Sequence, residues 1–140
     1  MPQSLRKPGG TMIAIDTNVV VRYLTGDHPE QSLRARALVD SQPVFLPVTV
    51  VLEAEWVLRS AYGYAVKDIV NALRAFGGLP GVMIEDAALM AEALDRAETG
   101  MDFADALHMG RSAHCEGIAS FDRKFVKAAQ SAGYHGVFEP

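Results

Sequence analysis

The sequence predicts an α/β fold, a three-layer α/β/α sandwich built around a central, mostly parallel sheet. Short apolar runs alternate with longer segments of helical periodicity from residue 12 to the end of the chain. The apolar runs are not interrupted by polar residues at every second position, which is typical of parallel strands covered by helices on both faces. In such sheets ligands bind beyond the carboxyl ends of the strands, so the residues that follow the strands are the first candidates for chemistry.

The individual elements follow from this pattern. We expect strands over residues 12–16, 43–46, 82–84, 117–120 and 136–138. We expect helices over residues 18–25, 29–40, 49–62, 66–76, 86–98, 102–114 and 123–132. Pro29 suits a first helical turn, Thr49 opens a helix and Gly63 ends it.

Length and composition indicate one folded domain. The chain has 140 residues, as many single domains do, and 49% of them are apolar, which is enough for a hydrophobic core. The first 11 residues contain prolines and glycines but almost no apolar side chain. We therefore expect a flexible leader over 1–11 and a domain over 12–140.

The sequence also bears on the cellular compartment. No apolar run approaches the roughly 18 residues that span a bilayer. The single cysteine, Cys115, cannot form an internal disulfide, and no apolar signal-peptide core follows Arg6 and Lys7. We expect a cytoplasmic protein without a membrane segment.

The charge balance limits the kind of nucleic-acid partner. Lysines and arginines number 13 against 17 acids, giving a net charge of −4 and a pI near 5.5. This balance argues against a protein that coats nucleic acid by charge alone. It is compatible with an enzyme whose acids hold metal ions.

Two carboxylates follow predicted strands. Asp16 ends the first strand, and Asp122 follows the strand at 117–120. Parallel strands present their carboxyl ends at one sheet edge, so both side chains are candidates for one site. Each could instead cap the helix that follows it, but two such residues favour a shared site.

The helix predicted over 49–62 carries two glutamates with different surroundings. Glu55 stands four residues before Arg59, the favoured spacing for a surface ion pair. Glu53 has no cation three or four residues away, and it borders an apolar stripe formed by Val50, Ala54, Val57, Leu58 and Ala61. A carboxylate at the margin of the core is costly unless a cation meets it, so Glu53 is the functional candidate.

Asp102 and Asp105 lie at the start of the helix expected over 102–114. We assign Asp102 mainly to capping. The spacing of three residues fits a capping box, but an aspartate at the second position is short for the return contact. The role of Asp105 therefore stays open.

Four acids from four separated segments thus form a candidate site, namely Asp16, Glu53, Asp105 and Asp122. Two carboxylates about 4 Å apart repel by on the order of 4 kcal/mol at an effective dielectric constant near 20, so a cluster of four requires divalent cations. Ligation by oxygen alone suits Mg²⁺ or Mn²⁺, and such a site favours phosphodiester hydrolysis by a metal-activated water. Candidates for holding substrate phosphates follow the last acid and are Arg123, Lys124 and Lys127.

The chain resembles a known family at four places in the right order. The segments MIAIDTNVVVRYL, VTVVLEAEWVLRSAYG, DFADALHMG and IASFDRKF are similar to the successive motifs of the PIN domain, in particular of the VapC toxins of bacterial toxin–antitoxin pairs. The resemblance runs from Met12 to the C-terminus. It implies a metal-dependent ribonuclease with Asp16, Glu53, Asp105 and Asp122 at its site, of which Asp16 and Asp105 are the usual direct metal ligands.

The resemblance has further implications for supporting residues and partners. It implies polar side chains beside the metal ligands, at Thr17, Asn18 and Ser120. It also implies an RNA substrate, a homodimer and a cognate antitoxin whose tail occupies the active-site groove.

The sequence gives less support to other functions. The four histidines form no zinc-binding pattern, and Cys115 has no triad partners. The aromatic residues at helical spacing, Trp56, Tyr62, Tyr64 and Phe76, are expected in the core or at a dimer contact rather than in a nucleic-acid stacking surface. Two alternatives stay open: a PIN nuclease of RNA processing that has no antitoxin, and a non-catalytic α/β interaction module whose acids are helix caps and surface charges.

Overall fold

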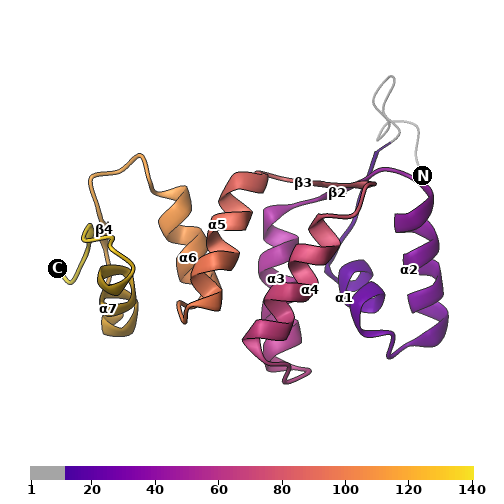
Figure 1. Cartoon of the computed structure of the whole chain (residues 1–140), viewed down its shortest axis with the longest axis horizontal. Helices are drawn as coiled ribbons and strands as arrows, with labels where there is room; N and C mark the ends of the chain where they lie inside the picture. Colours follow the sequence, from indigo (N-terminus) through magenta and orange to yellow (C-terminus); the bar gives the residue numbers. More distant parts are fainter. Residues whose placement is uncertain (1–11) are drawn as a thin grey trace.

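The computed structural model describes residues 12–140, so the predicted leader over 1–11 lies outside the described residues. Helices and strands alternate along the described chain (Figure 1). In order they are β1 (Ile13–Ala14), α1 (Thr17–Thr25), α2 (Pro29–Ser41), β2 (Val44–Leu46), α3 (Val48–Ser60), α4 (Val66–Gly77), β3 (Val82–Ile84), α5 (Ala87–Glu98), α6 (Phe103–Arg111), β4 (Ile118–Ala119), α7 (Arg123–Ser131) and β5 (Val137–Phe138). Every predicted helix and strand is present, with most boundaries within a few residues.

Capping signals mark the start of some helices, but the expected start at Thr49 is wrong, because α3 begins at Val48 after Pro47 and has no side-chain cap. Pro29 occupies the first turn of α2, as predicted. Asp86 caps α5 from the left-handed region at φ 52°, and its side chain accepts the N–H of Leu89. Gly26 ends α1 in the left-handed conformation at φ 66°, which glycine adopts without a steric cost.

All strand pairs are parallel, which confirms the predicted α/β class. Strands β1, β2 and β3 form one sheet in the order β1-β2-β3, and β4 pairs with β5 in a second sheet. The difference from the expectation is that the five strands form two sheets. Strands β1 and β4 are therefore both edge strands.

The core of the larger sheet lies between its strands and the helices that follow them. In Figure 1, α1, α3 and α4 lie below β2 and β3. The register line Ile13–Val44–Val82 is buried or half-buried, with Val44 fully buried. The adjacent line, Ala14–Phe45–Met83, is more exposed: Ala14 is exposed, Phe45 is half-buried and Met83 is 56% exposed.

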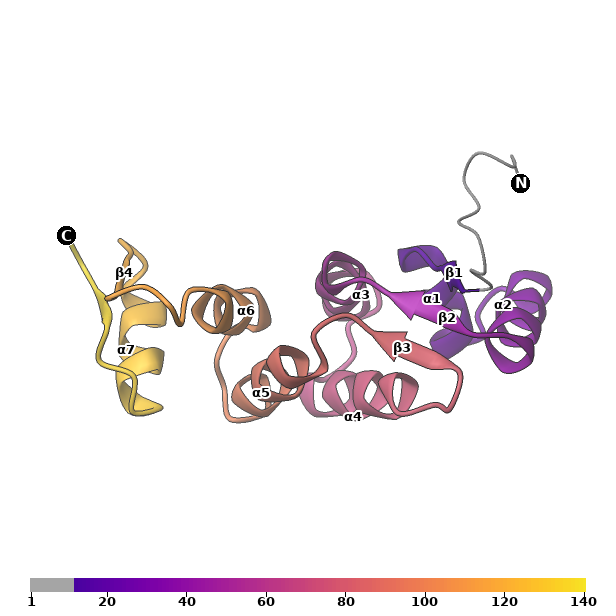
Figure 2. The ribbon, with the colours of Figure 1, turned by 90° about the horizontal axis from the view of Figure 1, so that it is seen from above.

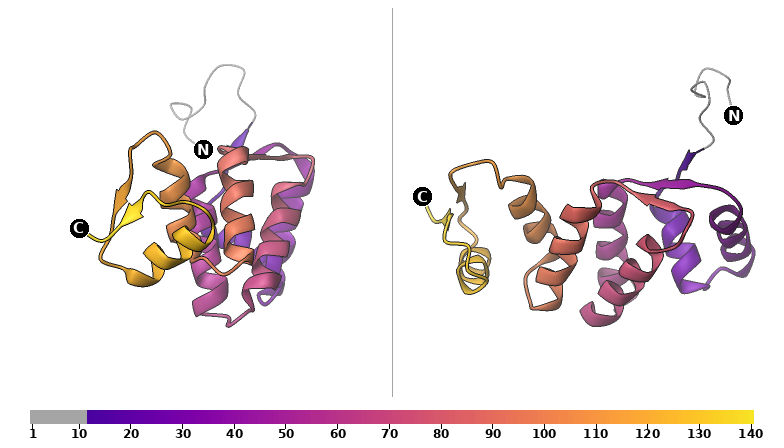
Figure 3. Two further views of the ribbon diagram at one scale, coloured as in Figure 1. Left: turned by 60° about the vertical axis from the view of Figure 1, so that its left-hand side comes forward. Right: turned by 45° about the horizontal axis from the view of Figure 1, so that its top comes forward.

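Residues 117–140, here called the C-terminal unit, form a separate small layer. Strands β4 and β5 pair, α7 packs against β5, and the substantial contacts of all three elements are with one another. Phe125, Ala129 and Val137 are buried within this unit. Figure 3 shows the unit at one end of the molecule, beyond α6, whereas β1 lies toward the other end.

Within residues 12–140, none of the helices has the length and apolar character needed to cross a bilayer.

Candidate functional site

Asp16 lies directly after β1 and is the N-cap of α1. One carboxylate oxygen accepts the backbone N–H of Asn18 at 3.1 Å and that of Val19 at 3.4 Å. The capping alternative is thus confirmed for this residue. Capping uses Oδ1 alone, so the second oxygen has lone pairs available for another partner.

Asp122 occupies the equivalent position, directly before α7 and as its N-cap. Its Oδ1 accepts the N–H groups of Lys124 and Phe125, at 3.0 Å and 3.1 Å, and its own N–H donates to the Ser120 hydroxyl oxygen at 3.0 Å. Ser120 therefore supports the loop that presents Asp122. Two acids follow two parallel strands and cap two helices, as the sequence pattern indicates.

Glu53 lies elsewhere on α3 than the sequence predicts. Its side chain is exposed rather than at the margin of the core, and it accepts a hydrogen bond from the hydroxyl of Thr17 in the first turn of α1. This contact explains how Glu53 is held without a nearby cation. Because Thr17 follows Asp16 directly, Glu53 and Asp16 belong to one part of the surface.

Glu55, expected on the surface, is the buried glutamate of α3. It is 5% exposed and forms a bidentate ion pair with Arg59, with its Oε2 2.8 Å from Nε. The predicted ion pair is confirmed, but Glu55 is buried and not on the surface as predicted. The true buried face consists of Val48, Val51, Ala54, Glu55 and Leu58, so the stripe proposed from the sequence is rotated relative to it.

Asp105 stands in the first turn of α6, capped by Asp102, whose carboxylate accepts the Asp105 N–H at 3.1 Å. The assignment of Asp102 to capping is thus confirmed. Burial of the Asp105 carboxyl raises its pKa, and the negative charges of Asp102 and Asp122 raise it further, while His108 opposes them. The electrostatic field of Asp122 therefore reaches Asp105.

The four acids thus fall into two sets by the contacts and charges around them. Glu53 contacts the turn that begins at Asp16, and Asp105 lies within the field of Asp122. Across residues 12–140, the structure contains no group of three or more histidine, cysteine, aspartate or glutamate side chains placed to hold one metal ion. The donor chemistry suits a divalent cation, but the described residues of one chain do not place three of these donors around one point.

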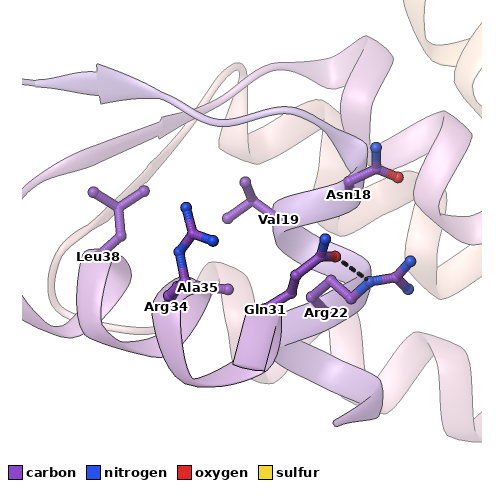
Figure 4. A pocket seen from close by; sticks show the side chains of 7 residues that line it. All are labelled: Asn18, Val19, Arg22, Gln31, Arg34, Ala35 and Leu38. Carbon is purple, nitrogen blue, oxygen red and sulfur yellow. Dashed lines mark hydrogen bonds between the residues drawn. The ribbon is translucent and has the colours of Figure 1, made fainter. Parts of the chain in front are cut away.

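A pocket of about 420 Å³ lies between α1 and α2 (Figure 4). Asn18 and Arg22 border it from α1, and Gln31 and Arg34 border it from α2. Arg22 donates through Nε to the side-chain oxygen of Gln31 at 2.9 Å, which fixes its guanidinium at the rim. The sequence did not reveal this pocket, since it exists only through the packing of two helices.

The basic residues after Asp122 differ in their surroundings. Arg123 is exposed and lies 3.3 Å from a Glu139 carboxylate oxygen. Lys124 borders a pocket together with Asp102 and Glu55. Lys127 is exposed on α7.

The aromatic residues divide between core and surface. Phe76 is buried and packs edge-on against Tyr23, with ring centroids 5.1 Å apart. Trp56 is 57% exposed and borders a pocket with Glu53, so the expectation of a core position is wrong for it.

Comparison with known proteins gives one family. Residues 13–130 match the family described as PIN domain. A search of the curated proteins gives no significant match.

Proposed function

Since this chain belongs to the PIN domain family, whose members are generally nucleases that use divalent metal ions, we propose that it is a metal-dependent endoribonuclease. The observation that carries the proposal is the pair of strand-end aspartates. Asp16 and Asp122 follow two parallel strands in the same way, and each uses one carboxylate oxygen for capping. That leaves an oxygen on each for a cation.

The proposed site comprises Asp16, Glu53, Asp105 and Asp122, with Mg²⁺ or Mn²⁺ as the ion. A divalent cation bound by carboxylates lowers the pKa of its bound water and so supplies the nucleophile for phosphodiester hydrolysis. Thr17 positions Glu53 by its hydrogen bond, and Ser120 supports the backbone at Asp122. Arg123, Lys124 and Lys127 lie near the start of α7, where a substrate phosphate bound at Asp122 would be held.

The finer assignment is to the VapC type. We propose that the chain is the toxin of a toxin–antitoxin pair, that it forms a homodimer in the cytoplasm, and that an antitoxin tail covers the acids. The support is the resemblance of the four sequence motifs. An antitoxin gene beside this one, and recovery of the two proteins as a complex, would separate the toxin from a PIN nuclease of RNA processing.

The test is cleavage of a structured RNA with Mg²⁺ or Mn²⁺. Wild type should cleave, and EDTA should stop cleavage. Asp16→Asn should lower the rate by about 100-fold, as loss of a key electrostatic group at an active site typically does. Asp86→Asn is the matched control, since Asp86 also caps a helix but lies in neither set of acids. Asparagine caps a helix as well as aspartate does, so both variants should fold.

A non-catalytic interaction module is the second candidate, favoured by the capping roles of Asp16 and Asp122. Under that function no RNA is cleaved with either metal, and the two asparagine variants behave alike. Cleavage that persists in EDTA contradicts the metal-dependent mechanism.

A further inference from the structure

A cavity of about 320 Å³ lies where four helices meet, and none of the four proposed acids borders it. It is bordered by the C-terminal parts of α3 and α5 and by the N-terminal ends of α4 and α6. Figure 2 shows α6 between α5 and α7 along the length of the molecule, and Lys124 of α7 also borders the cavity. The charged residues at its border are Glu55, Arg59, Lys67, Glu98, Asp102 and Lys124. Three cations and three acids thus share one cavity.

The acids at this cavity are already engaged within the fold. Glu55 is 5% exposed, and its two carboxylate oxygens accept hydrogen bonds from Nε and Nη2 of Arg59 at 2.8 Å and 3.3 Å. Glu98 accepts a hydrogen bond from Arg74 at 3.0 Å. Asp102 is the N-cap of α6. Each acid therefore has a structural partner.

The cations retain donors for another group. Lys67 and Lys124 are exposed, and neither forms an ion pair within residues 12–140. Arg59 binds Glu55 through Nε and Nη2, so its Nη1 has no hydrogen bond among the described residues. Three cationic side chains with unused donors thus border the cavity.

The buried ion pair holds Arg59 in place. A buried pair of this kind contributes little net stability compared with apolar side chains of the same volume. Apolar side chains, however, could not fix a guanidinium at the border of a cavity. The Arg59 side chain is 38% exposed, so its charge is both anchored by Glu55 and accessible. A preorganised guanidinium is well suited to phosphate oxygens.

Backbone hydrogen bonds connect this cavity to the proposed site. Asp102, at its border, accepts the N–H of Asp105 at 3.1 Å. Lys124, also at its border, donates its N–H to Asp122 at 3.0 Å. A polynucleotide with one phosphate bound at Asp105 and Asp122 would therefore have a neighbouring phosphate within reach of the cavity.

We propose that this cavity holds a backbone phosphate of an RNA strand, next to the phosphate that is cleaved. Arg59 and Lys67 would be its principal ligands, and Lys124 would bind it from the side nearer Asp122. The inference rests on the proposed function, since it takes RNA to be the substrate. Contacts with phosphate carry no sequence information, so the cavity would add affinity and fix the position of the strand relative to the acids.

The first test is RNA binding without cleavage. In EDTA and at low salt, fluorescence anisotropy gives Kd for a short, labelled single-stranded RNA. Lys67→Gln should raise Kd about tenfold, because a hydrogen bond between charged groups is lost. Arg111→Gln is the matched control, since Arg111 is also exposed and without an ion pair in the described chain but borders a different pocket. It should leave Kd nearly unchanged.

A second variant tests the guanidinium. Arg59→Gln alone would leave the buried Glu55 without its cation, so it is combined with Glu55→Gln. The double variant should weaken RNA binding about as much as Lys67→Gln does. A circular dichroism melt of each variant identifies any loss of folding.

The second test identifies the phosphate. One neutral methylphosphonate linkage is moved along the oligonucleotide, with a 2′-O-methyl ribose before it to protect the linkage. At one position the neutral linkage should weaken binding to wild type about tenfold and leave binding to Lys67→Gln unchanged, because that contact is already absent. Equal weakening of both proteins at every position overturns the proposal, and so does a Lys67→Gln variant that binds RNA as tightly as Arg111→Gln.

The two proposals can fail separately. Wild type that binds RNA through this cavity but never cleaves it contradicts the nuclease function alone. Wild type that cleaves RNA while Lys67→Gln and Arg111→Gln bind it equally well contradicts the phosphate cavity alone. In a cleaving enzyme, Lys67→Gln should raise KM and leave kcat nearly unchanged, since the contact is distant from the reacting atoms.

Discussion

The body of the molecule, residues 12–116, and its C-terminal unit are both built from helices and parallel strands, but they are stabilised to different degrees. In the body, α1 packs against α2 and α3, and α4 packs against α3 and α5, so both of these helices contact two others. In the C-terminal unit, one helix covers two short strands and buries Phe125, Ala129 and Val137. Two-stranded sheets are marginally stable by themselves, so the unit is the part of the fold that gains most from a partner.

Truncation of a buried side chain should have different effects in the body and in the C-terminal unit. Phe76→Ala in the body should lower the free energy of unfolding by about 3–5 kcal/mol, the usual cost for a buried phenylalanine. Phe125→Ala should instead lower hydrogen-exchange protection within residues 117–140 and leave that of α3 and α4 nearly unchanged. Equal loss of protection in both regions after Phe125→Ala would show that the chain unfolds as one cooperative unit.

Substitution of the two glutamates of α3 should affect different properties, stability for the buried Glu55 and cleavage for the exposed Glu53. Glu55→Gln removes the charge partner of the half-exposed Arg59 and should lower the free energy of unfolding by about 1–3 kcal/mol. Glu53→Gln should abolish most cleavage but leave thermal stability nearly unchanged, because Glu53 is exposed. Denaturant melts and cleavage rates of both variants check this, and Glu92→Gln, exposed on α5, is the neutral control.

The smallest expected effect concerns Asp105. Its raised pKa means that the folded state disfavours the ionised carboxyl, so wild-type stability falls as pH rises from about 4 through the folded-state pKa. Asp105→Asn should therefore raise Tm in EDTA at neutral pH by about 2–4 °C and have little effect below pH 4.

Added Mg²⁺ should then raise Tm of wild type more than that of Asp105→Asn, since a ligand stabilises the state that binds it. A variant that melts lower in EDTA and gains as much from Mg²⁺ would show that Asp105 acts only as a favourable charge in the first turn of α6.

Much of the fold could be predicted from the sequence because its signals are local. Apolar runs marked the strands, and Asp16 and Asp122 could be recognised as residues that end strands and begin helices. The buried face of α3 could not be read in the same way. That helix is apolar on most sides, and Glu55 enters the core because Arg59, one turn away, compensates its charge.

The pairing of the strands also could not be predicted from the sequence. A run such as Ile118-Ala119 predicts a strand but does not identify its neighbours, since parallel pairing depends on contacts between distant segments. The four acids could therefore be chosen by type and position, while their division into two sets emerged only from the structure.

Three of the four acids lie at helix N-termini, and this position affects the electrostatics of the metal-free protein. Asp16 and Asp122 each cap a helix, and Asp105 stands in a first turn. A helix N-terminus carries a partial positive charge of about one half, so three helix dipoles offset part of the repulsion among the carboxylates. The backbone thus provides a fixed partial positive charge beside each of these three carboxylates.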